Sequence, residues 1–140
     1  MGFLKTATTW NTPELTYLKG EVEAASGVQL MVSLHNRVLR ELGEAKRLLG
    51  EIEAGEKPVC PSVSESLQRG RQILAALIGT VNDTDDASSR MVTVYYTAME
   101  QILAAELEKN SGPIAHILPS IEMLRDRWVE ILHAETTDKS

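Results

Sequence analysis

Glu130 and His133 have the Glu-x-x-His spacing that supplies metal ligands in many helical bundles. A di-metal site needs this motif on two helices, and the chain has no second copy. The acidic run Asn82-Asp83-Thr84-Asp85-Asp86 resembles the beginning of a calcium loop, but the following glycine and the distal glutamate are missing. We therefore predict no metal site and no cofactor, and we interpret the acidic run as a turn before a helix.

The other reactive side chains also lack partners that would make them catalytic. Cys60 is the one cysteine, which excludes an intramolecular disulfide and fits a reducing, cytoplasmic location. His35 lies in an apolar helical pattern, where it is either a buried histidine bonded to a neighbour or a functional group. No phosphate loop, nucleotide fingerprint or serine elbow is present. The sequence thus predicts a protein that is not an enzyme.

The element that must position His35 is a long helix with one apolar seam. The seam positions recur in steps of three and four: Val28, Met31, His35, Val38, Leu42, Ala45, Leu49 and Ile52. They predict one helix from the capping residue Ser26 to about Gly55, roughly 40 Å long. Because such a helix cannot bury its seam alone, it must pack against other helices in a bundle.

Capping signals on either side of this helix indicate two more. A short first helix begins at Thr12-Pro13-Glu14, where a capping threonine precedes the proline of the first turn, and it carries Tyr17. A third helix opens with the capping box Ser62-Val63-Ser64-Glu65 and runs to about Val81. The intervening segment, with glycine and two prolines, must be a loop.

Two further helices complete the chain. The fourth runs from about residue 87 to 109, and the fifth covers about 114 to 133, with Pro119 expected to kink or split it. Short loops between long helices favour antiparallel neighbours. We predict an all-α fold, an antiparallel up-and-down four-helix bundle with a short additional N-terminal helix. It forms a single domain over residues 1–140, with a core at about 12–133 and frayed termini.

Composition and charge narrow the classes of partner. The chain has 140 residues, 43% of them hydrophobic and 24% charged, with a formal net charge of −6. An acidic chain without a basic block is a poor ligand for nucleic acid or anionic membranes. It also lacks an apolar stretch of about eighteen residues and an N-terminal signal. We expect a soluble protein with no nucleic-acid partner and no membrane insertion.

Two helices carry more apolar positions than one buried face of about 100° requires. The fourth has Met91, Val92, Val94, Tyr95, Tyr96, Ala98, Met99, Ile102, Leu103, Ala105 and Leu107. The long helix adds Leu30, Val32, Leu34, Leu39 and Leu48 outside its seam. Either these helices touch neighbours on several sides, or the surplus forms a groove for an amphipathic segment of another protein, with methionines giving adaptable contacts.

The order of landmarks along the chain resembles one known family. The landmarks are Tyr17, Ala25-Ser26-Gly27, Leu34-His35-Asn36, Val94-Tyr95 and Leu124-Arg125-Asp126-Arg127-Trp128. They resemble the early Tyr, Ala-Ser-Pro turn, Leu-Tyr-Asp, Leu-Tyr pair and Leu-Arg-x-x-Trp ending of the flagellar secretion chaperone family (FliS). The resemblance covers roughly residues 15–132. It departs from the family at Gly27, which replaces proline, and at His35-Asn36, which replace Tyr-Asp.

The resemblance implies a cytoplasmic chaperone that binds the disordered C-terminal segment of flagellin. Such a chaperone prevents premature polymerisation and delivers flagellin to the flagellar type III export apparatus, whose gate components are further partners. By the same resemblance, Tyr17 and its helix are a candidate cap over the groove. The residues predicted to contact the partner lie beside the core seams: Tyr17, Leu30, Leu34, His35, Tyr96, Met99 and Leu103.

Alternatives to the flagellin chaperone stay open at this stage. The departures at Gly27 and His35-Asn36 allow a helical scaffold protein of the same fold that has lost flagellin. A small bundle enzyme or metal carrier is a third interpretation. Monomer and homodimer are both compatible with the sequence.

Overall fold

The computed structural model describes residues 27–56, 58, 60–81 and 86–138. Four helices fill these ranges: α2 (Gly27–Glu53), α3 (Pro61–Thr80), α4 (Asp86–Glu108) and α5 (Gly112–Asp138). They confirm the all-α bundle that the sequence predicts. The predicted N-terminal helix with Tyr17 and the capping residue Ser26 lie outside the described residues.

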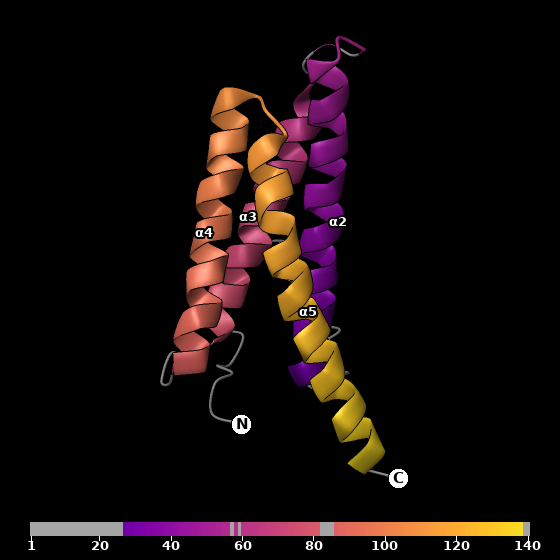
Figure 1. Cartoon of the computed structure of the whole chain (residues 1–140), viewed down its shortest axis with the longest axis vertical. Coiled ribbons are helices and arrows are strands. Elements are labelled where there is room, and N and C mark those ends of the chain that lie inside the picture. Colours follow the sequence, from indigo (N-terminus) through magenta and orange to yellow (C-terminus); the bar gives the residue numbers. More distant parts are fainter. Residues whose placement is uncertain (1–26, 57, 59, 82–85, 139–140) are drawn as a thin grey trace.

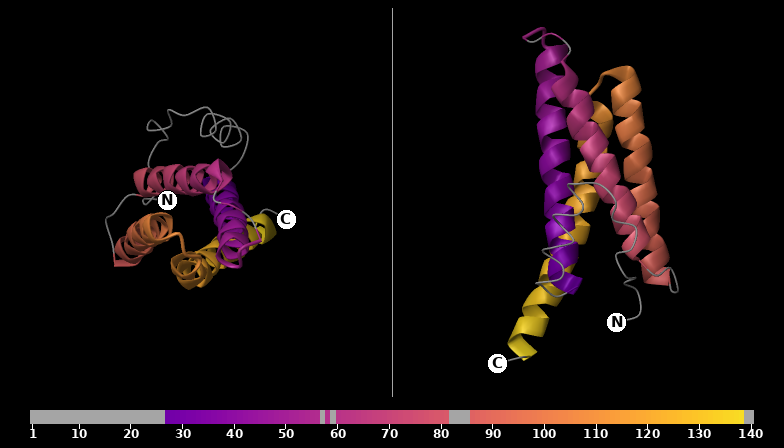
Figure 2. Two further views of the ribbon diagram at one scale, coloured as in Figure 1. Left: turned by 90° about the horizontal axis from the view of Figure 1, so that it is seen from above. Right: turned by 180° about the vertical axis from the view of Figure 1, so that it is seen from behind.

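The four helices run up and down around a common interior (Figure 1). Each packs against the next in sequence, and α5 packs back against α2, which closes the ring. Consequently α2 and α4 lie on one diagonal of the bundle, as the view from above in Figure 2 shows. Among the described helices, α2 therefore packs mainly against α3 and α5, and α4 packs against the same two helices.

The apolar seam of α2 lies in the core as predicted. Seven of its positions are buried, and the eighth, Ile52, packs partly buried at the end. A second row of α2, with Leu30, Leu34 and Leu48, is buried as well. Because α2 contacts α3 on one side and α5 on the other, both rows meet neighbours. For α2, the apolar surplus is therefore explained by packing within the bundle.

Glycine ends α2 where the sequence predicts. Gly55 has a φ of 76°, in the left-handed region that glycine adopts without a steric penalty. The Gly55 N–H donates to the Ile52 carbonyl at 3.0 Å, and the Glu56 N–H donates to the Glu51 carbonyl at 2.9 Å. This pair of bonds is a Schellman motif, which satisfies carbonyls that the helix end leaves without partners.

The predicted N-cap of α3 is wrong by two residues. The helix begins at Pro61, and Cys60 occupies the N-cap position without a side-chain capping bond. Ser62 therefore lies inside the helix and is not the cap of a capping box. The reason is that proline has a fixed φ suited to the first helical position and needs no hydrogen-bond acceptor there.

The fifth helix is continuous through Pro119, so the proline does not split it. Proline removes the hydrogen bond to the carbonyl of Ala115. Both residues are exposed, and water can reach that carbonyl. At the start of α5, the Ser111 N–H donates to Oε1 of Glu53 at 2.6 Å. This bond ties the beginning of α5 to the end of α2.

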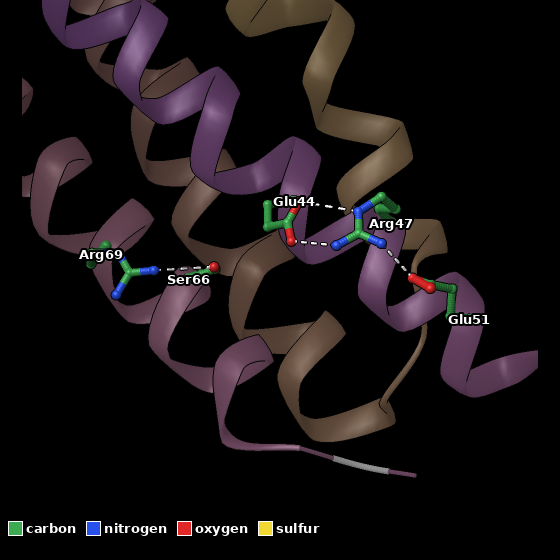
Figure 3. A network of polar contacts seen from close by, with 5 residues as sticks. All are labelled: Glu44, Arg47, Glu51, Ser66 and Arg69. Carbon is green, nitrogen blue, oxygen red and sulfur yellow. Dashed lines mark hydrogen bonds and ion pairs between the residues drawn. The ribbon is translucent and has the colours of Figure 1, made fainter. Parts of the chain in front are cut away.

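Arg47 on α2 and Arg69 on α3 each bond to polar side chains of their own helix (Figure 3). Arg47 lies between Glu44 and Glu51 on neighbouring turns, with N–O distances of 2.5 and 2.6 Å. On α3, Arg69 donates to Oε2 of Glu41 on α2 at 2.9 Å. The Glu41 carboxylate is buried, and this ion pair fixes α3 beside α2 at the edge of the core.

Candidate partner-binding surface

His35 lies in the centre of the bundle with none of its surface exposed. Its Nδ1–H donates to the Met31 carbonyl at 2.6 Å, since a carbonyl can only accept. Its Nε2 lies 2.9 Å from the Tyr95 hydroxyl, which donates to it when the imidazole is neutral. Of the two interpretations made from the sequence, the structure gives the buried histidine bonded to neighbours.

The hydrogen bonds continue from Tyr95 to the last helix. Tyr95 is completely buried, and Trp128 is 3% exposed. A side-chain hydrogen bond joins them, and because an indole N–H only donates, the Tyr95 oxygen accepts it. Trp128 on α5, Tyr95 on α4 and His35 on α2 therefore form one chain of hydrogen bonds, called the core network below.

The electrostatics of the core network favour uncharged groups. Burial lowers the pKa of His35 to about 4; the hydrogen bond to Met31 opposes this shift, and the positive charge of Arg125 adds to it. Burial also raises the pKa of Tyr95 well above its usual range, against a smaller opposing effect of the bond with Trp128. Both groups are neutral at pH 7 and closed to solvent, so their arrangement suits positioning rather than acid–base chemistry.

Asn36 follows His35 in sequence but lies at the surface between α2 and α5. Its Oδ1 accepts a hydrogen bond from Nη1 of Arg125 at 3.1 Å. Arg125 also donates through Nε to Asp126 at 2.7 Å. The His35-Asn36 departure from the family pattern therefore affects two places, the core network and the contact of α2 with α5.

The fourth helix carries a row of apolar side chains on its outer side. We call this row the α4 stripe; its members are Val92, Tyr96, Met99, Leu103 and Leu107. Their spacing places all five within an arc of about 80° around the helix axis. Tyr96, Leu103 and Leu107 are 54%, 51% and 74% exposed, and Val92 and Met99 are partly buried against the core. An exposed row of this kind is typical of a surface that binds an amphipathic segment.

The structure divides the predicted partner-binding residues into two groups. Leu30, Leu34 and His35 are buried in the bundle, whereas Tyr96 and Leu103 are exposed. Met99 is partly buried against the core, and Tyr17 is outside the described residues. The predicted set did not include Leu107, which is the most exposed large apolar side chain of the described residues. Its position four residues after Leu103 was the signal that could have identified it.

The helix α5 also exposes large apolar side chains: Met123 is 57% exposed and Ile131 is 39% exposed. An open hollow beside Met123 is lined also by Pro119 and by four charged residues, Glu122, Asp126, Arg127 and Glu130. These charged side chains make this face less favourable for an apolar segment than the α4 stripe. A smaller cavity of about 50 Å³ lies at the other end of the bundle, lined in part by Cys60, Ile52 and Lys109.

Within the part of the chain that the structure describes, no group of three or more His, Cys, Asp or Glu residues is placed to hold a metal ion. Glu130 and His133 are both exposed on α5. In the same described ranges, no helix is long and apolar enough to cross a membrane.

The described residues form an all-α four-helix bundle with a row of exposed apolar side chains on α4, an arrangement typical of helical proteins that bind other proteins. The family model described as "Flagellar protein FliS" matches residues 11–135, and the chain belongs to this family. It is similar to the flagellar secretion chaperone FliS of Bacillus subtilis (strain 168), with 21% identity over 127 residues that cover 91% of each chain. The protein thus has a role as a flagellar chaperone and is not an enzyme, as the sequence predicted.

Proposed function

We propose that the protein binds the disordered C-terminal segment of flagellin in the cytoplasm. It prevents premature polymerisation and delivers the subunit to the flagellar type III export apparatus. The observation that carries this proposal is the α4 stripe, in which three large apolar side chains are more than half exposed on one side of one helix. Membership of the flagellar chaperone family supports the choice of cargo.

The physical basis is coupled folding and binding. A disordered segment that forms an amphipathic helix can place anchors at every third or fourth residue against a rigid apolar row. Its ordering costs roughly 2–5 kcal/mol, which burial of apolar surface must exceed. Met99 lies in the middle of the α4 stripe, and its flexible thioether adapts to different anchor shapes.

The buried members of the predicted site have a different part in this proposal. Leu34 and His35 have no exposed surface, and Leu30 has 6%. Direct contact with flagellin would require the interior beside α2 to open. We therefore propose that flagellin first contacts Tyr96, Met99, Leu103 and the added Leu107. The buried α2 residues contribute indirectly, through the packing of the bundle interior.

The proposal is tested by calorimetric titration with the flagellin C-terminal segment of the same organism. We expect one-to-one binding with a negative heat-capacity change, which reports burial of apolar surface. Leu103→Glu should weaken the affinity by about tenfold or more, because it puts a charge into the contact. Met123→Glu is the matched control on α5, since Met123 is 57% exposed and Leu103 is 51% exposed. Equal affinities for the two variants, with unchanged helicity, would show that the segment does not bind at the α4 stripe.

A scaffold protein that has lost flagellin is the second candidate. Its support is that Asn36, at a position of departure from the family pattern, engages Arg125 at the junction of α2 and α5. This candidate predicts no heat and no co-elution with the flagellin segment from a folded, helical sample. The titration therefore separates the two functions.

A further inference from the structure

The fourth helix has two apolar faces, and the larger side chains are on the outer one. The apolar residues of the buried face are Tyr95, Ala98, Ile102 and Ala105, and Ser88 in the first turn is buried as well. The α4 stripe, with tyrosine, methionine, two leucines and a valine, lies about 120° away around the helix axis. Because hydrophobic stabilisation grows with buried apolar area, burial alone does not select the face that the structure places inside.

A directional interaction does distinguish the two faces. The Tyr95 hydroxyl reaches His35 on the diagonally opposite helix at 2.9 Å and also bonds to Trp128 on α5. The ring centroids of His35 and Tyr95 are 5.6 Å apart, so the contact spans the middle of the bundle. Rotation of α4 would carry the hydroxyl away and leave buried polar groups without partners, which is costly in a low-dielectric interior.

We propose that the core network of His35, Tyr95 and Trp128 sets the rotation of α4 and so keeps the α4 stripe turned outward for a partner. His35 is then a positioning residue for the binding surface, although it is closed to solvent. A single buried polar group that fixes the register of packed helices is a known use of such groups. That the partner is flagellin rests on the proposed function; the orientation of the stripe does not.

Close packing is the competing reason for the same orientation. A Cβ atom at Gly70 of α3 would lie 3.0 Å from Cδ2 of Leu42 and 3.8 Å from Cδ1 of Ile102. The interior between α2, α3 and α4 is therefore narrow, and small residues such as Ala98 and Ala105 suit it. If packing alone sets the rotation, loss of the hydroxyl will leave the stripe outside.

Thiol labelling separates the two explanations. In a Cys60→Ser background, one reporter is Leu103→Cys on the outer side and another is Ala98→Cys on the inner side. Each is compared with and without Tyr95→Phe, which removes one oxygen atom and keeps the ring. His35→Leu with Tyr95→Phe is the stronger variant, because it removes both members of the diagonal bond.

With the core network broken, we expect the outer reporter to label about threefold more slowly and the inner reporter about tenfold faster, as α4 samples other rotations. Thr80→Val is the control; it removes a buried hydroxyl that bonds to Leu77 and Met31 without reaching α4. It should lower stability and leave both labelling rates unchanged. Unchanged rates in folded Tyr95→Phe and in the double variant would overturn the proposal.

The labelling result is independent of any partner. If the core network variants label as expected but the unmodified protein does not bind flagellin, the proposed function fails and the positioning role stands. If flagellin binds and the labelling rates do not respond, the positioning role fails and the function stands.

Discussion

His35 and Asn36 are neighbours in sequence whose side chains lie in different environments. The imidazole is enclosed by the bundle and bonded at both nitrogens, and the amide lies at the surface against Arg125. A polar ring in a core is stable only when its hydrogen-bonding groups have partners. The neutral form of His35 has them, since one nitrogen donates to a carbonyl and the other accepts from a hydroxyl.

Acid should destabilise the protein through His35. The pKa of His35 is about 4 in the folded state, against 6.5 for an unperturbed histidine, so the unfolded chain binds the proton more readily. The contribution of neutral His35 to the free energy of unfolding is therefore complete above about pH 6.5. As the pH falls from 6.5 toward 4, the free energy of unfolding should decrease by about 3 kcal/mol. Urea unfolding of the protein at several pH values in this window measures the slope.

Carboxylates also titrate in this range, so the comparison with a variant decides the assignment. His35→Leu should have a shallower loss of stability between pH 6.5 and 4, whatever its stability at pH 7. His116→Gln, at an exposed position of α5, should retain the slope of the unmodified protein. Identical slopes for His35→Leu and the unmodified protein would assign the acid sensitivity to other groups.

The sequence predicts the place of His35 but not its partner. The apolar steps of three and four put it on the inner face of α2, which the structure confirms. Tyr95 lies 60 residues further along the chain, and no local pattern links the two. Periodicity also cannot tell whether the row of Leu30 and Leu34, beside the seam, meets solvent or a second helix. That depends on how α5 packs against α2.

At the scale of the element, boundaries were predicted best where one residue type has a special backbone preference. Gly55 ends α2 because its left-handed φ suits glycine. At α3, the sequence has two start signals: Ser62 as an N-cap residue and Pro61 as a first helical residue. The helix begins at Pro61. For Pro119, the sequence could not decide whether the helix splits, because that depends on whether the carbonyl of Ala115 reaches water.

Two helical glycines should respond in opposite ways to alanine. Alanine is better than glycine in a helix interior by roughly 0.5–1 kcal/mol. Gly43 of α2 is exposed and has no atom within 4 Å of an added Cβ, so Gly43→Ala should raise the free energy of unfolding by about this amount. At Gly70, the new Cβ would lie 3.0 Å from Cδ2 of Leu42 in the core. Gly70→Ala should therefore lower the free energy of unfolding by about 1 kcal/mol.

Urea denaturation of both variants measures these changes, with the slope of the transition as a check that the unfolding reaction is the same. Equal stabilisation by the two substitutions would mean that Leu42 moves aside easily. The close approach of α3 to α2 and α4 would then not constrain the bundle.

At the scale of the whole molecule, the ion pairs of Arg47 and the exposed apolar stripe lie on different helices of the bundle. The outer face of α2 carries ion pairs of Arg47 with Glu44 and Glu51 (Figure 3), whereas α4, on the opposite corner, carries the apolar stripe. Fold class depends on the repeated pattern of apolar positions, which many sequences satisfy. The exposure of α4 depends on which of its two faces turns inward, and the pattern alone does not state that.

Binding at the α4 stripe should raise the thermal stability of the entire bundle. A ligand that binds only the folded state at a hundred times its Kd stabilises by about 2.7 kcal/mol, which for a domain of this size is a rise in Tm of about 5–10 °C. We expect this rise with the flagellin C-terminal segment for the unmodified protein and for Met123→Glu, followed by circular dichroism. Leu103→Glu should show little of it at the same concentration. A rise in Leu103→Glu as large as in the unmodified protein would show that the segment binds the folded bundle at another surface.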